Sequence, residues 1–483
     1  MLTNGTGSDT STPKGRPGFP GPSPAGRPIP IPPDKSTELP DEEIIRSGIF
    51  NLAWPAITEM ILMTVTQIVD MLMVGQLGPW AIAAVGIANQ PFFFIMAVFQ
   101  ALAVGTTAII ARMTGAGDRA STGHVLRQSV LLAVSLGIMA SAIFTVLGPR
   151  VIQFMGAEPE VYTPSLGYFR VIVGGLIFTA LTIILIAALR GAGDTRTPMI
   201  VRGVANILNV VFNYLFIFGA FGFPRLEVMG AATGTILSRV FTVLALAWVI
   251  SKNRTVLSWS GSFRAGFDRE VIRRIARVGF PAAMEQIIMR SGQLIFVRTV
   301  AGMGTSAMAA HQIAMNIESL SIMPGFGFSV AATTLVGQHL GARRPLWAER
   351  AGFMTSRVAV ISMSIMGILL FAFGPSVVHL YTDDPEVIAL GGIALRILAL
   401  AQPFCAISFT MAGSLRGAGD TRFVMISTAL GIWGVRLGTA YTLGVTLGLG
   451  VPGAWIGLVA DQLLRSLLTR RRFAGGAWKG IRV

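Results

Sequence analysis

The sequence has very little cysteine and little charge, and both shortages narrow what the protein can be. Cys405 is the one cysteine among 483 residues, which excludes an internal disulfide and a cysteine-ligated metal cluster. Its place in an apolar run also argues against a reactive thiol. Charged residues make up 13% of the chain and hydrophobic residues 53%, with a mean hydropathy of +0.67. This composition excludes an ordinary soluble domain and predicts a membrane protein.

Acidic residues are also few, at 23 against 38 basic residues, so the chain has a formal net charge of +15. The basic residues are scattered singly between apolar runs and do not form one face, as a nucleic-acid surface would. We therefore expect no nucleic-acid partner, and we attribute the positive charge to orientation in a lipid bilayer.

Residues 1–40 lack apolar runs and are rich in Pro, Gly and Ser. They contain no apolar core of the kind that a signal peptide needs. A segment of this composition buries too little apolar surface to fold. We expect a disordered tail here, on the cytoplasmic side of the membrane.

Long apolar runs begin after the tail, and each is long enough to cross a bilayer, which takes ~20 helical residues. The predicted helices of the first half cover residues 50–76, 84–112, 124–148, 162–189, 197–221 and 229–252. Those of the second half cover residues 276–302, 310–338, 350–374, 388–415, 423–447 and 452–471. The sequence therefore predicts an all-α membrane protein with twelve transmembrane helices.

An internal repeat relates the two halves. The octapeptide Leu-Arg-Gly-Ala-Gly-Asp-Thr-Arg occurs at residues 189–196 and again at 415–422, an offset of 226 residues. The same offset aligns further identical residues: Pro55 with Pro281, Glu59 with Glu285, Gln67 with Gln293, and Arg170 with Arg396. One offset serving so many positions indicates the tandem duplication of a unit of roughly 200 residues. We expect an N-lobe of residues 41–252, a basic linker of residues 253–275 and a C-lobe of residues 276–483.

Basic residues concentrate in alternate connections between the predicted helices. These connections hold Arg112 and Arg119, Arg190 and Arg196, Lys252 to Arg277, Arg343 and Arg344, and Arg416 and Arg422. By the positive-inside rule these connections and both termini are cytoplasmic in a multi-pass protein of the cell inner (plasma) membrane. Because each half has an even number of spans, the lobes share one orientation and are related by a pseudo-two-fold axis along the membrane normal. Paired halves of this kind suggest a transporter.

The two six-helix halves, the twin octapeptides and the segment Ala309 to Ile313 together resemble the multidrug and toxic compound extrusion (MATE) family, from about residue 45 to 470. The resemblance implies a secondary antiporter that exports organic cations and drugs by alternating access, driven by Na⁺ or H⁺. It implies no enzyme activity and no cofactor apart from the coupling ion, and we expect a monomer. The octapeptide is no phosphate cradle, since no nucleotide-binding lysine motif follows it. It suits a tight turn in which Gly191 and Gly193 adopt positive φ.

A carboxylate inside a bilayer is costly, so each carboxylate within a span is a candidate for function. In the first predicted helix, Asp70 lies six residues from the outer end and Glu59 lies eleven residues before Asp70. Eleven residues return to nearly the same face of a helix, so a polar stripe is expected to face the interior of the lobe. The stripe consists of Glu59, Met63, Thr66, Gln67 and Asp70.

The fifth predicted helix carries a second polar stripe, which includes Asn209 and Asn213 at a depth similar to that of Asp70. A carboxylate, amide oxygens and a hydroxyl from Thr233 or Thr235 form an oxygen set suited to Na⁺. The same Asp70 could bind a proton instead. The resemblance implies the same residues, because family members carry an aspartate that matches Asp70 and amides that match Asn209 and Asn213. The expected ion-coupling residues are Asp70, Asn209, Asn213, Thr233, Thr235 and Glu59, with Asp70, Asn209 and Asn213 as metal ligands if the ion is Na⁺.

Glu59 is a weaker candidate, since its repeat mate Glu285 occupies the same site in the other lobe and a residue shared by both lobes is more often scaffold. One branch of the family has carboxylates in the second lobe, at positions that match Met289 and Cys405. Their replacement here argues against such an ion site in that lobe. The other charges within the spans of the second half are expected to form buried ion pairs: Arg290, Arg298, Glu318, Arg436 and Asp461. His311 is expected to cap or pack its helix near the outer surface.

The substrate cavity is expected between the lobes, with a lining suited to varied flat, apolar cations. The expected lining residues are Gln67, Met63, Phe92, Gln293 and Met289. An alternative function on the same six-plus-six plan is a flippase or exporter of a lipid-linked or other amphiphilic metabolite, which would need a strongly cationic lumen. An intramembrane enzyme is disfavoured, because the sequence has no Gly-x-Ser-x-Gly and no His-Glu-x-x-His motif.

Overall fold

The computed structural model describes residues 41–252, 255–259 and 266–481, and no strand occurs among them. The predicted tail, and parts of the predicted linker, lie outside the described residues. The first half consists of α1 (Glu42–Gly75), α2 (Pro79–Gly115), α3 (Arg119–Phe154), α4 (Pro159–Gly174), α5 (Leu176–Gly191), α6 (Arg196–Phe218), the short η1 (Ala220–Gly222) and α7 (Val228–Ser251). The second half consists of α8 (Arg269–Ala301), α9 (Thr305–Ser321), α10 (Met323–Gly341), α11 (Pro345–His379), α12 (Pro385–Gly417), α13 (Thr421–Ala429), η3 (Leu430–Arg436), α14 (Leu437–Thr439), η4 (Ala440–Thr446), α15 (Gly450–Ala474) and η5 (Ala477–Gly480).

These helices make twelve spans, six in each half, as the sequence predicts. Three of the spans are built from more than one element. α4 and α5 form one span that bends by 49° at Gly175, and α9 and α10 form another that continues across Ile322. The segment from α13 to η4 is a third, and η3 and η4 within it are π-helical. The span predicted at residues 162–189 is therefore present, but it is bent and consists of two helices.

Most helices are longer than predicted, and helix capping explains two of the differences. α1 begins at Glu42, not at residue 50, because the Asp41 carboxylate accepts hydrogen bonds from the Glu43 and Ile44 amides. α8 begins at Arg269 because Asp268 caps it in the same way, so the linker ends before the predicted residue 275. Polar residues that satisfy the first turn extend both helices beyond their apolar runs.

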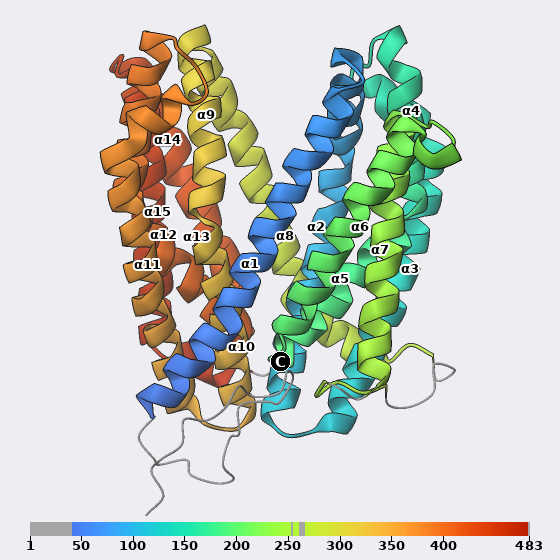
Figure 1. The fold of residues 1–483 in the computed structure, drawn as a ribbon. Coiled ribbons are helices and arrows are strands. Elements are labelled where there is room, and N and C mark those ends of the chain that lie inside the picture. The colour runs from blue at the N-terminus through green and yellow to red at the C-terminus, as the bar shows by residue number, and fades with distance from the viewer. Residues whose placement is uncertain (1–40, 253–254, 260–265, 482–483) are drawn as a thin grey trace, which may run out of the picture.

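The two halves form two lobes that lie side by side, and α1 and α8 cross from one lobe to the other (Figure 1). α1 packs against α10 of the second half and against α6 of its own half. α8 does the reverse, packing against α2 of the first half and α13 of its own half. α1 and α8 therefore each contact both halves of the chain.

The contacts between α2 and α10 come in pairs that the 226-residue offset interchanges. A Cβ added to Gly115 would lie 1.9 Å from the Gln338 carbonyl oxygen, and one added to Gly341 would lie 2.0 Å from the Arg112 carbonyl oxygen. Gly115 and Gly341 are repeat mates, and so are Arg112 and Gln338. Such an exchange of partners places a two-fold axis between α2 and α10. The lobes therefore share one orientation, as predicted.

Both octapeptides lie at the end of the molecule where α2 and α10 meet, and this end is called the octapeptide face below. The backbone carbonyls of each octapeptide accept hydrogen bonds from side chains of the other half. The Thr334 hydroxyl donates to the Arg190 carbonyl oxygen at 2.9 Å, and Gln338 Nε2 donates to the Gly191 carbonyl oxygen at 3.2 Å. Arg112 Nη2 donates to the Ala418 carbonyl oxygen at 3.1 Å. The repeated loops thus form the junction between the lobes.

The glycines of the octapeptides serve two different purposes. Gly193 and its mate Gly419 have φ of +90° and +86°, so they adopt the left-handed conformation predicted for the turn. The prediction of positive φ at Gly191 was wrong, because this residue ends α5 in helical geometry. A larger residue would not fit at position 191, because an added Cβ would lie 2.7 Å from the Thr107 carbonyl oxygen.

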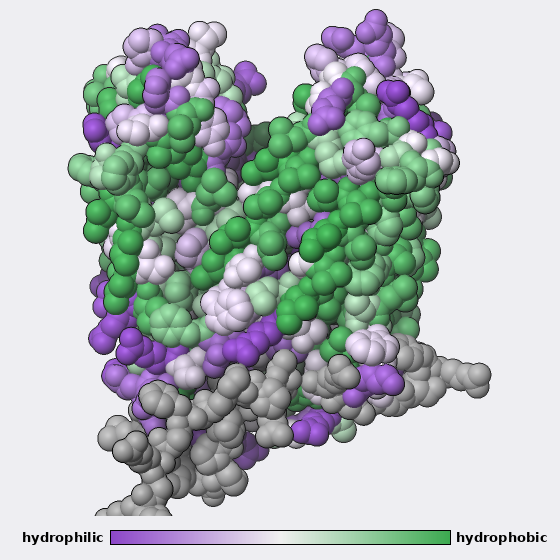
Figure 2. Space-filling view, viewed as in Figure 1, coloured by the Kyte–Doolittle hydropathy of each residue, from purple (hydrophilic) through white to green (hydrophobic). Residues whose placement is uncertain are grey.

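At the end opposite the octapeptide face, a hollow separates the two lobes, and apolar side chains cover much of the surface between the two ends (Figure 2). One face of α1 contributes exposed apolar side chains to this surface: Phe50, Trp54, Ile61, Val65, Ile68 and Leu72. A contiguous apolar band of this extent is suited to contact with lipid.

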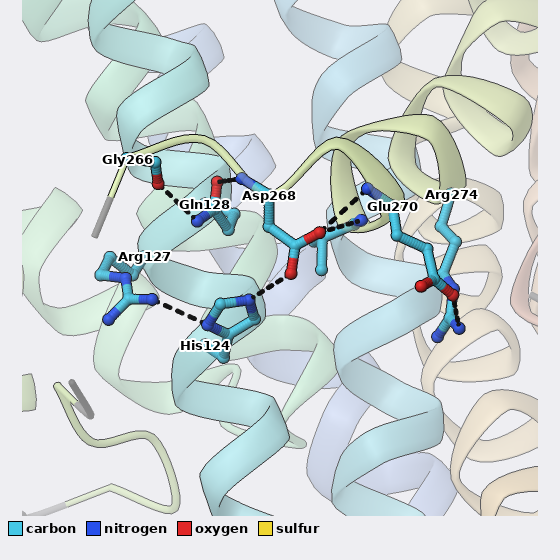
Figure 3. Close-up of polar contacts among 8 residues, drawn as sticks. His124, Arg127, Gln128, Gly266, Asp268, Glu270 and Arg274 are labelled. Atoms are coloured by element: carbon cyan, nitrogen blue, oxygen red, sulfur yellow. Dashed lines mark hydrogen bonds and ion pairs between the residues drawn. The ribbon is translucent and has the colours of Figure 1, made fainter.

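The end of the linker is fixed to α3 by a group of polar contacts (Figure 3). Arg127 donates to His124 Nδ1 at 2.8 Å, so Nε2 carries the ring hydrogen and donates to Asp268 Oδ2 at 2.9 Å. Gln128 Nε2 donates to the Gly266 carbonyl oxygen at 3.0 Å, and Gln128 Oε1 accepts from the Asp268 amide. These contacts hold the start of α8 against the first half.

Candidate functional site

Asp70 and Asn213 meet inside the first half, where α1 packs against α6. Asn213 Nδ2 donates a hydrogen bond of 2.7 Å to Asp70 Oδ1, and it lies 3.5 Å from Asn209 Oδ1. Asn213 is wholly buried and Asn209 nearly so, whereas Asp70 is half-buried. The three side chains that the sequence predicted to converge therefore lie together, with the carboxylate on the more open side.

α7 completes this group with a glycine that sequence reasoning missed. A Cβ added to Gly234 would lie 2.2 Å from Asn213 Oδ1, so α7 can approach this closely only without a side chain there. Asn213 Oδ1 has no hydrogen-bond partner among the described residues. A buried acceptor oxygen beside a carboxylate is suited to a cation. A glycine between two threonines in an apolar helix was the available signal.

Thr233 and Thr235 flank Gly234, so the structure brings both to the level of Asn213. The Thr233 hydroxyl donates to the Met229 carbonyl oxygen of its own helix at 2.9 Å. Within the described part of the chain, neither threonine hydroxyl bonds to Asp70 or Asn213. Both are adjacent to the group of Asp70, Asn209 and Asn213 without being joined to it.

Arg239 of α7 is the cation next to this group. It exerts an electrostatic attraction on Asp70, but the two form no ion pair within the described residues. Arg239 Nη1 donates to the Thr179 hydroxyl at 2.6 Å, and its guanidinium lies 5.6 Å from the centroid of the Phe92 ring. Phe92, predicted to line the cavity, is instead partly buried beneath this arginine. Asp70 is thus oriented toward Asn213 and is not locked to Arg239.

Glu59 is occupied by ion pairs and does not join Asp70. Its side chain is 1% exposed; Glu59 Oε2 lies 2.7 Å from Arg190 Nη2, and Glu59 Oε1 lies 3.3 Å from Arg202 Nε. The second half repeats the first of these pairs, with Arg416 Nη2 at 2.7 Å from Glu285 Oε1. Arg190 and Arg416 are the arginines at the second position of the two octapeptides. A pair present in both lobes fits the scaffold role that the repeat suggested for Glu59.

A pocket between the lobes contains two of the predicted cavity residues. It has a volume of about 190 Å³ and lies between α1 and the α9–α10 span. Its lining residues are Met60, Met63, Thr64, Gln67, Ser319, Met323 and Phe326. Methionine and aromatic side chains with a few hydroxyls and an amide make an adaptable, weakly polar surface.

The remaining predicted cavity residues, Met289 and Gln293, do not line this pocket. They are the repeat mates of Met63 and Gln67, so they lie at the equivalent place on α8. A larger hollow of about 450 Å³ lies between α1 and α6. It includes the exposed side chains of Val211 and Tyr214, so it opens on the apolar outer surface of the first lobe.

The ion pairs predicted inside the second half are partly present. Arg436 Nη2 lies 2.6 Å from Asp461 Oδ2, and Arg465 Nε lies 2.9 Å from Asp461 Oδ1. Glu318 is 8% exposed, and its Oε2 has no hydrogen-bond partner among the described residues. His311 is wholly buried and packs between the Phe296 and Trp455 rings, so it packs its helix and does not cap it.

Three comparisons with known proteins cover both halves of the chain. The family model described as MatE matches residues 55–215 and 281–442. The chain is 37% identical over 446 residues to the probable multidrug resistance protein NorM of Thermotoga maritima, covering 91% of this chain and 95% of that protein. It is 30% identical over 440 residues to the multidrug resistance protein PmpM of Pseudomonas aeruginosa, covering 90% and 92%. A solved structure of an outward-facing multidrug resistance MATE family transporter of the MOP superfamily matches with a TM-score of 0.82 and 27% identity, covering 89% of this chain and 96% of that chain.

Proposed function

This chain belongs to the MatE family of multidrug and toxic compound extrusion transporters, and on that premise we propose that it is a secondary antiporter. It exports organic cations and other xenobiotics in exchange for Na⁺ or H⁺. The observation that carries the proposal is the hydrogen bond of Asn213 to Asp70, a carboxylate that forms no ion pair within the described residues. A half-buried carboxylate with amide partners is able to exchange a cation between the protein and water.

Asp70 is the residue to which the coupling ion binds. If the ion is Na⁺, Asp70 Oδ1, Asn209 Oδ1 and Asn213 Oδ1 supply oxygen ligands, and Asn213 turns its amide so that the oxygen replaces the donated N–H. If the ion is H⁺, the proton resides on Asp70, and a protonated Asp70 could donate to an amide oxygen. Thr233 and Thr235 stand beside the group and are available as further hydroxyl ligands. Glu59 stays ion-paired in either case and is not part of the exchange.

The substrate occupies the cleft between the lobes, at the pocket lined by Met60, Met63 and Gln67. Polarisable methionine side chains and Phe326 suit flat apolar cations of varied shape. Met289 and Gln293 of α8 extend the cleft on the pseudo-symmetric side. A ligand in this position touches both lobes, so its affinity depends on how far the lobes have separated.

The octapeptide face is the cytoplasmic side of the inner (plasma) membrane. The basic residues gathered at this end and the positive-inside rule support this orientation. The structure is closed at this face and hollowed at the other, so it corresponds to an outward-open state. Alternating access then requires the α2–α10 contacts and the bonds to the octapeptides to break while the opposite ends of the lobes close.

Asp70→Asn is the test of the proposal. Efflux of a fluorescent organic cation is measured in inverted vesicles under separately imposed Na⁺ and H⁺ gradients. We expect efflux driven by either gradient to be lost in Asp70→Asn, while Asp383→Asn, at a side chain 98% exposed, transports as wild type does. The two gradients applied to wild type identify the ion.

The assay is informative only if the variant is folded, so its thermal unfolding in detergent is compared with that of wild type. Full gradient-driven efflux by a folded Asp70→Asn protein would place the coupling ion elsewhere. Export of an amphiphilic metabolite without any dependence on either ion gradient would favour the flippase alternative.

A further inference from the structure

The second half contains a buried group of charged side chains that the proposed exchange at Asp70 does not use. Its members are Glu318 of α9, Arg436 of η3, and Asp461 and Arg465 of α15. Glu318 is 8% exposed, Asp461 is wholly buried, and Arg465 is 7% exposed. Burying four charges in a membrane protein is costly unless each is compensated, so their arrangement needs an explanation.

Asp461 accounts for only one of the two arginine charges. It is bonded by both: Arg436 Nη2 donates to Asp461 Oδ2 at 2.6 Å, and Arg465 Nη2 donates to the same oxygen at 3.2 Å. Together these three residues carry a net charge of +1. Glu318 lies within electrostatic range of all three but forms no ion pair with them among the described residues. An ionised Glu318 brings the group to neutrality, whereas a protonated Glu318 leaves it positive.

Gln402 of α12 carries a second buried oxygen without a donor, and its side chain is bonded to the turn of α9 that holds Glu318. Gln402 Nε2 of α12 donates to the Ser321 hydroxyl at 2.9 Å, and that hydroxyl donates to the Glu318 carbonyl oxygen at 2.9 Å. Neither Glu318 Oε2 nor Gln402 Oε1 has a partner within the described residues. A proton on Glu318 Oε2 would convert one of these unpaired acceptors into an O–H donor.

A proton suits this group better than a metal ion does. Among the described residues, no set of three or more His, Cys, Asp or Glu side chains is placed to hold a metal. The groups that face Glu318 from neighbouring elements are Arg436 of η3, Asp461 and Arg465 of α15, and the Cys405 thiol of α12. Two arginines beside the carboxylate oppose the approach of a cation, but a proton needs only one lone pair.

The structure of η3 gives protonation a mechanical consequence. Arg436 ends this π-helical segment, and π-helical turns are rare and concentrate at functional sites. The same segment packs on α8: Trp433 Nε1 donates to the Ile288 carbonyl oxygen at 3.3 Å, and a Cβ on Gly292 would lie 2.2 Å from Ile432 Cγ2. α8 is one of the two helices that cross between the lobes, so a change at Arg436 reaches the interface between them.

We propose that Glu318 is a proton-binding residue of the second lobe, which takes up a proton from water on Oε2 and returns it during the transport cycle. Proton uptake removes the charge that balances Arg436 and loosens the hold on η3. His311, seven residues earlier on the same face of α9, is wholly buried with both ring nitrogens unpartnered among the described residues, and it stands between Glu318 and the outer end of α9. The inference does not depend on which ion Asp70 binds.

The repeat shows that this group is not a copy of the Asp70 group. The 226-residue offset aligns Glu318 with Phe92, and the last helices align with an offset of 223, because Val-x-Gly-Ala at residues 228–231 of α7 recurs at residues 451–454 of α15. Asp461 then aligns with Ser238 and Arg465 with Thr242, so Glu318, Asp461 and Arg465 have no charged counterparts in the first lobe. This difference allows the two lobes to be tested separately.

The test is infrared difference spectroscopy of the full-length protein in lipid as the pH is lowered. It is carried out in the Asp70→Asn background, so that Asp70 contributes no signal. We expect acidification to produce the C=O stretching band of a protonated buried carboxyl, and we expect this band to be lost in Asp70→Asn with Glu318→Gln. A band that persists in the double variant, or no band in Asp70→Asn, overturns the proposal.

Glu318→Asp is a second variant, which keeps the test decisive if Glu318→Gln does not fold. It keeps a carboxyl but moves it by one methylene, so the band should remain and shift in frequency. An unshifted band overturns the assignment to residue 318. In the otherwise wild-type protein, Glu318→Gln should also change the pH profile of efflux, whereas a purely structural role would lower efflux by the same factor at every pH. Failure of these tests leaves the role of Asp70 untouched, because that role is tested by the efflux of Asp70→Asn.

Discussion

Asn213 is positioned by Asp70 on one side and by the bare backbone of Gly234 on the other. We expect Gly234→Ala to displace Asn213, because the added Cβ would lie 2.2 Å from its Oδ1. Overpacking of this kind costs ~1–3 kcal/mol. If the cost falls on ion binding, affinity decreases roughly ten- to hundredfold. Gradient-driven efflux over a series of ion concentrations measures the change.

Gly203→Ala is the matched control for Gly234→Ala, since its Cβ would meet Leu62 at an ordinary contact distance of 3.6 Å. It should leave the ion dependence of efflux unchanged. Equal effects from both substitutions would mean that Gly234 matters as a helix residue and not as the neighbour of Asn213.

Glu59 illustrates how a carboxylate in a span can be structural. We expect Glu59→Gln to lower the stability of the folded protein, because it leaves the Arg190 and Arg202 guanidinium groups inside the protein without their anion. Breaking a buried ion pair from one side typically costs ~3–5 kcal/mol. Thermal unfolding in detergent measures the loss, and Glu285→Gln should show a similar one.

The ion dependence of efflux separates this role from coupling. In the fraction of Glu59→Gln that folds, the ion concentration for half-maximal efflux should match that of wild type. A large shift in that concentration with unchanged stability would restore Glu59 as an ion ligand.

At the scale of helices, the two crossing helices α1 and α8 join the two halves through contacts on both sides. α1 and α8 each pack on both halves, and the octapeptide of each half is bonded by a residue of the other, through Gln338 and Arg112. Between α2 and α10 the junction consists largely of glycines packed against backbone carbonyls, so these helices approach closely. Beside it, α1 packs apolar side chains such as Ile49 and Leu52 into the core of the second half.

The polar contacts that hold the end of the linker against α3 depend on the charge of Asp268. The hydrogen bond from His124 is the largest influence that holds the pKa of Asp268 below its usual value, with the Val271 and Glu270 amides adding to it. A lowered pKa means that the contact is fully present above the usual pKa of about 3.9 and is lost as the pH falls through the lowered value. We therefore expect Asp268→Asn to speed hydrogen exchange at the start of α8 near neutral pH, and not in acid.

The comparison is made between wild type and variant at the same pH, so that intrinsic exchange rates cancel. Glu270→Gln is the control, because Glu270 bonds Arg274 on its own helix and should leave exchange unchanged. A difference in exchange rate between wild type and Asp268→Asn that persists below the pKa of Asp268 would show that these contacts depend on packing and not on charge.

For the whole molecule, the proposed orientation is tested by labelling single cysteines. Cys405 is buried and is the one cysteine of the chain, so Cys405→Ser provides a background without thiols. In intact cells, a membrane-impermeant maleimide should label Asp383→Cys and should not label Arg119→Cys until the membrane is permeabilised. Arg119 lies at the octapeptide face and Asp383 at the opposite end, so labelling in the reverse order would invert the proposed orientation.

Much of the architecture was predictable from the sequence, because periodicity and repetition are properties of the chain alone. Apolar run length determined the twelve spans, and a single offset determined that the halves share an orientation. The convergence of Asp70 with Asn213 was also predictable. Both side chains lie on polar faces of apolar helices at equal depth, and polar faces in a bilayer turn toward each other.

What the sequence left open concerns which helix meets which. Hydrophobic periodicity identifies the face of a helix that is buried but not the neighbour that buries it, so the crossing of α1 and α8 could not be derived. For the same reason the pairing of Glu59 with Arg190, the position of Arg239 and the group around Glu318 were decided by tertiary structure. These contacts join residues far apart in the chain, and only the packing of the two lobes brings their charges within reach of each other.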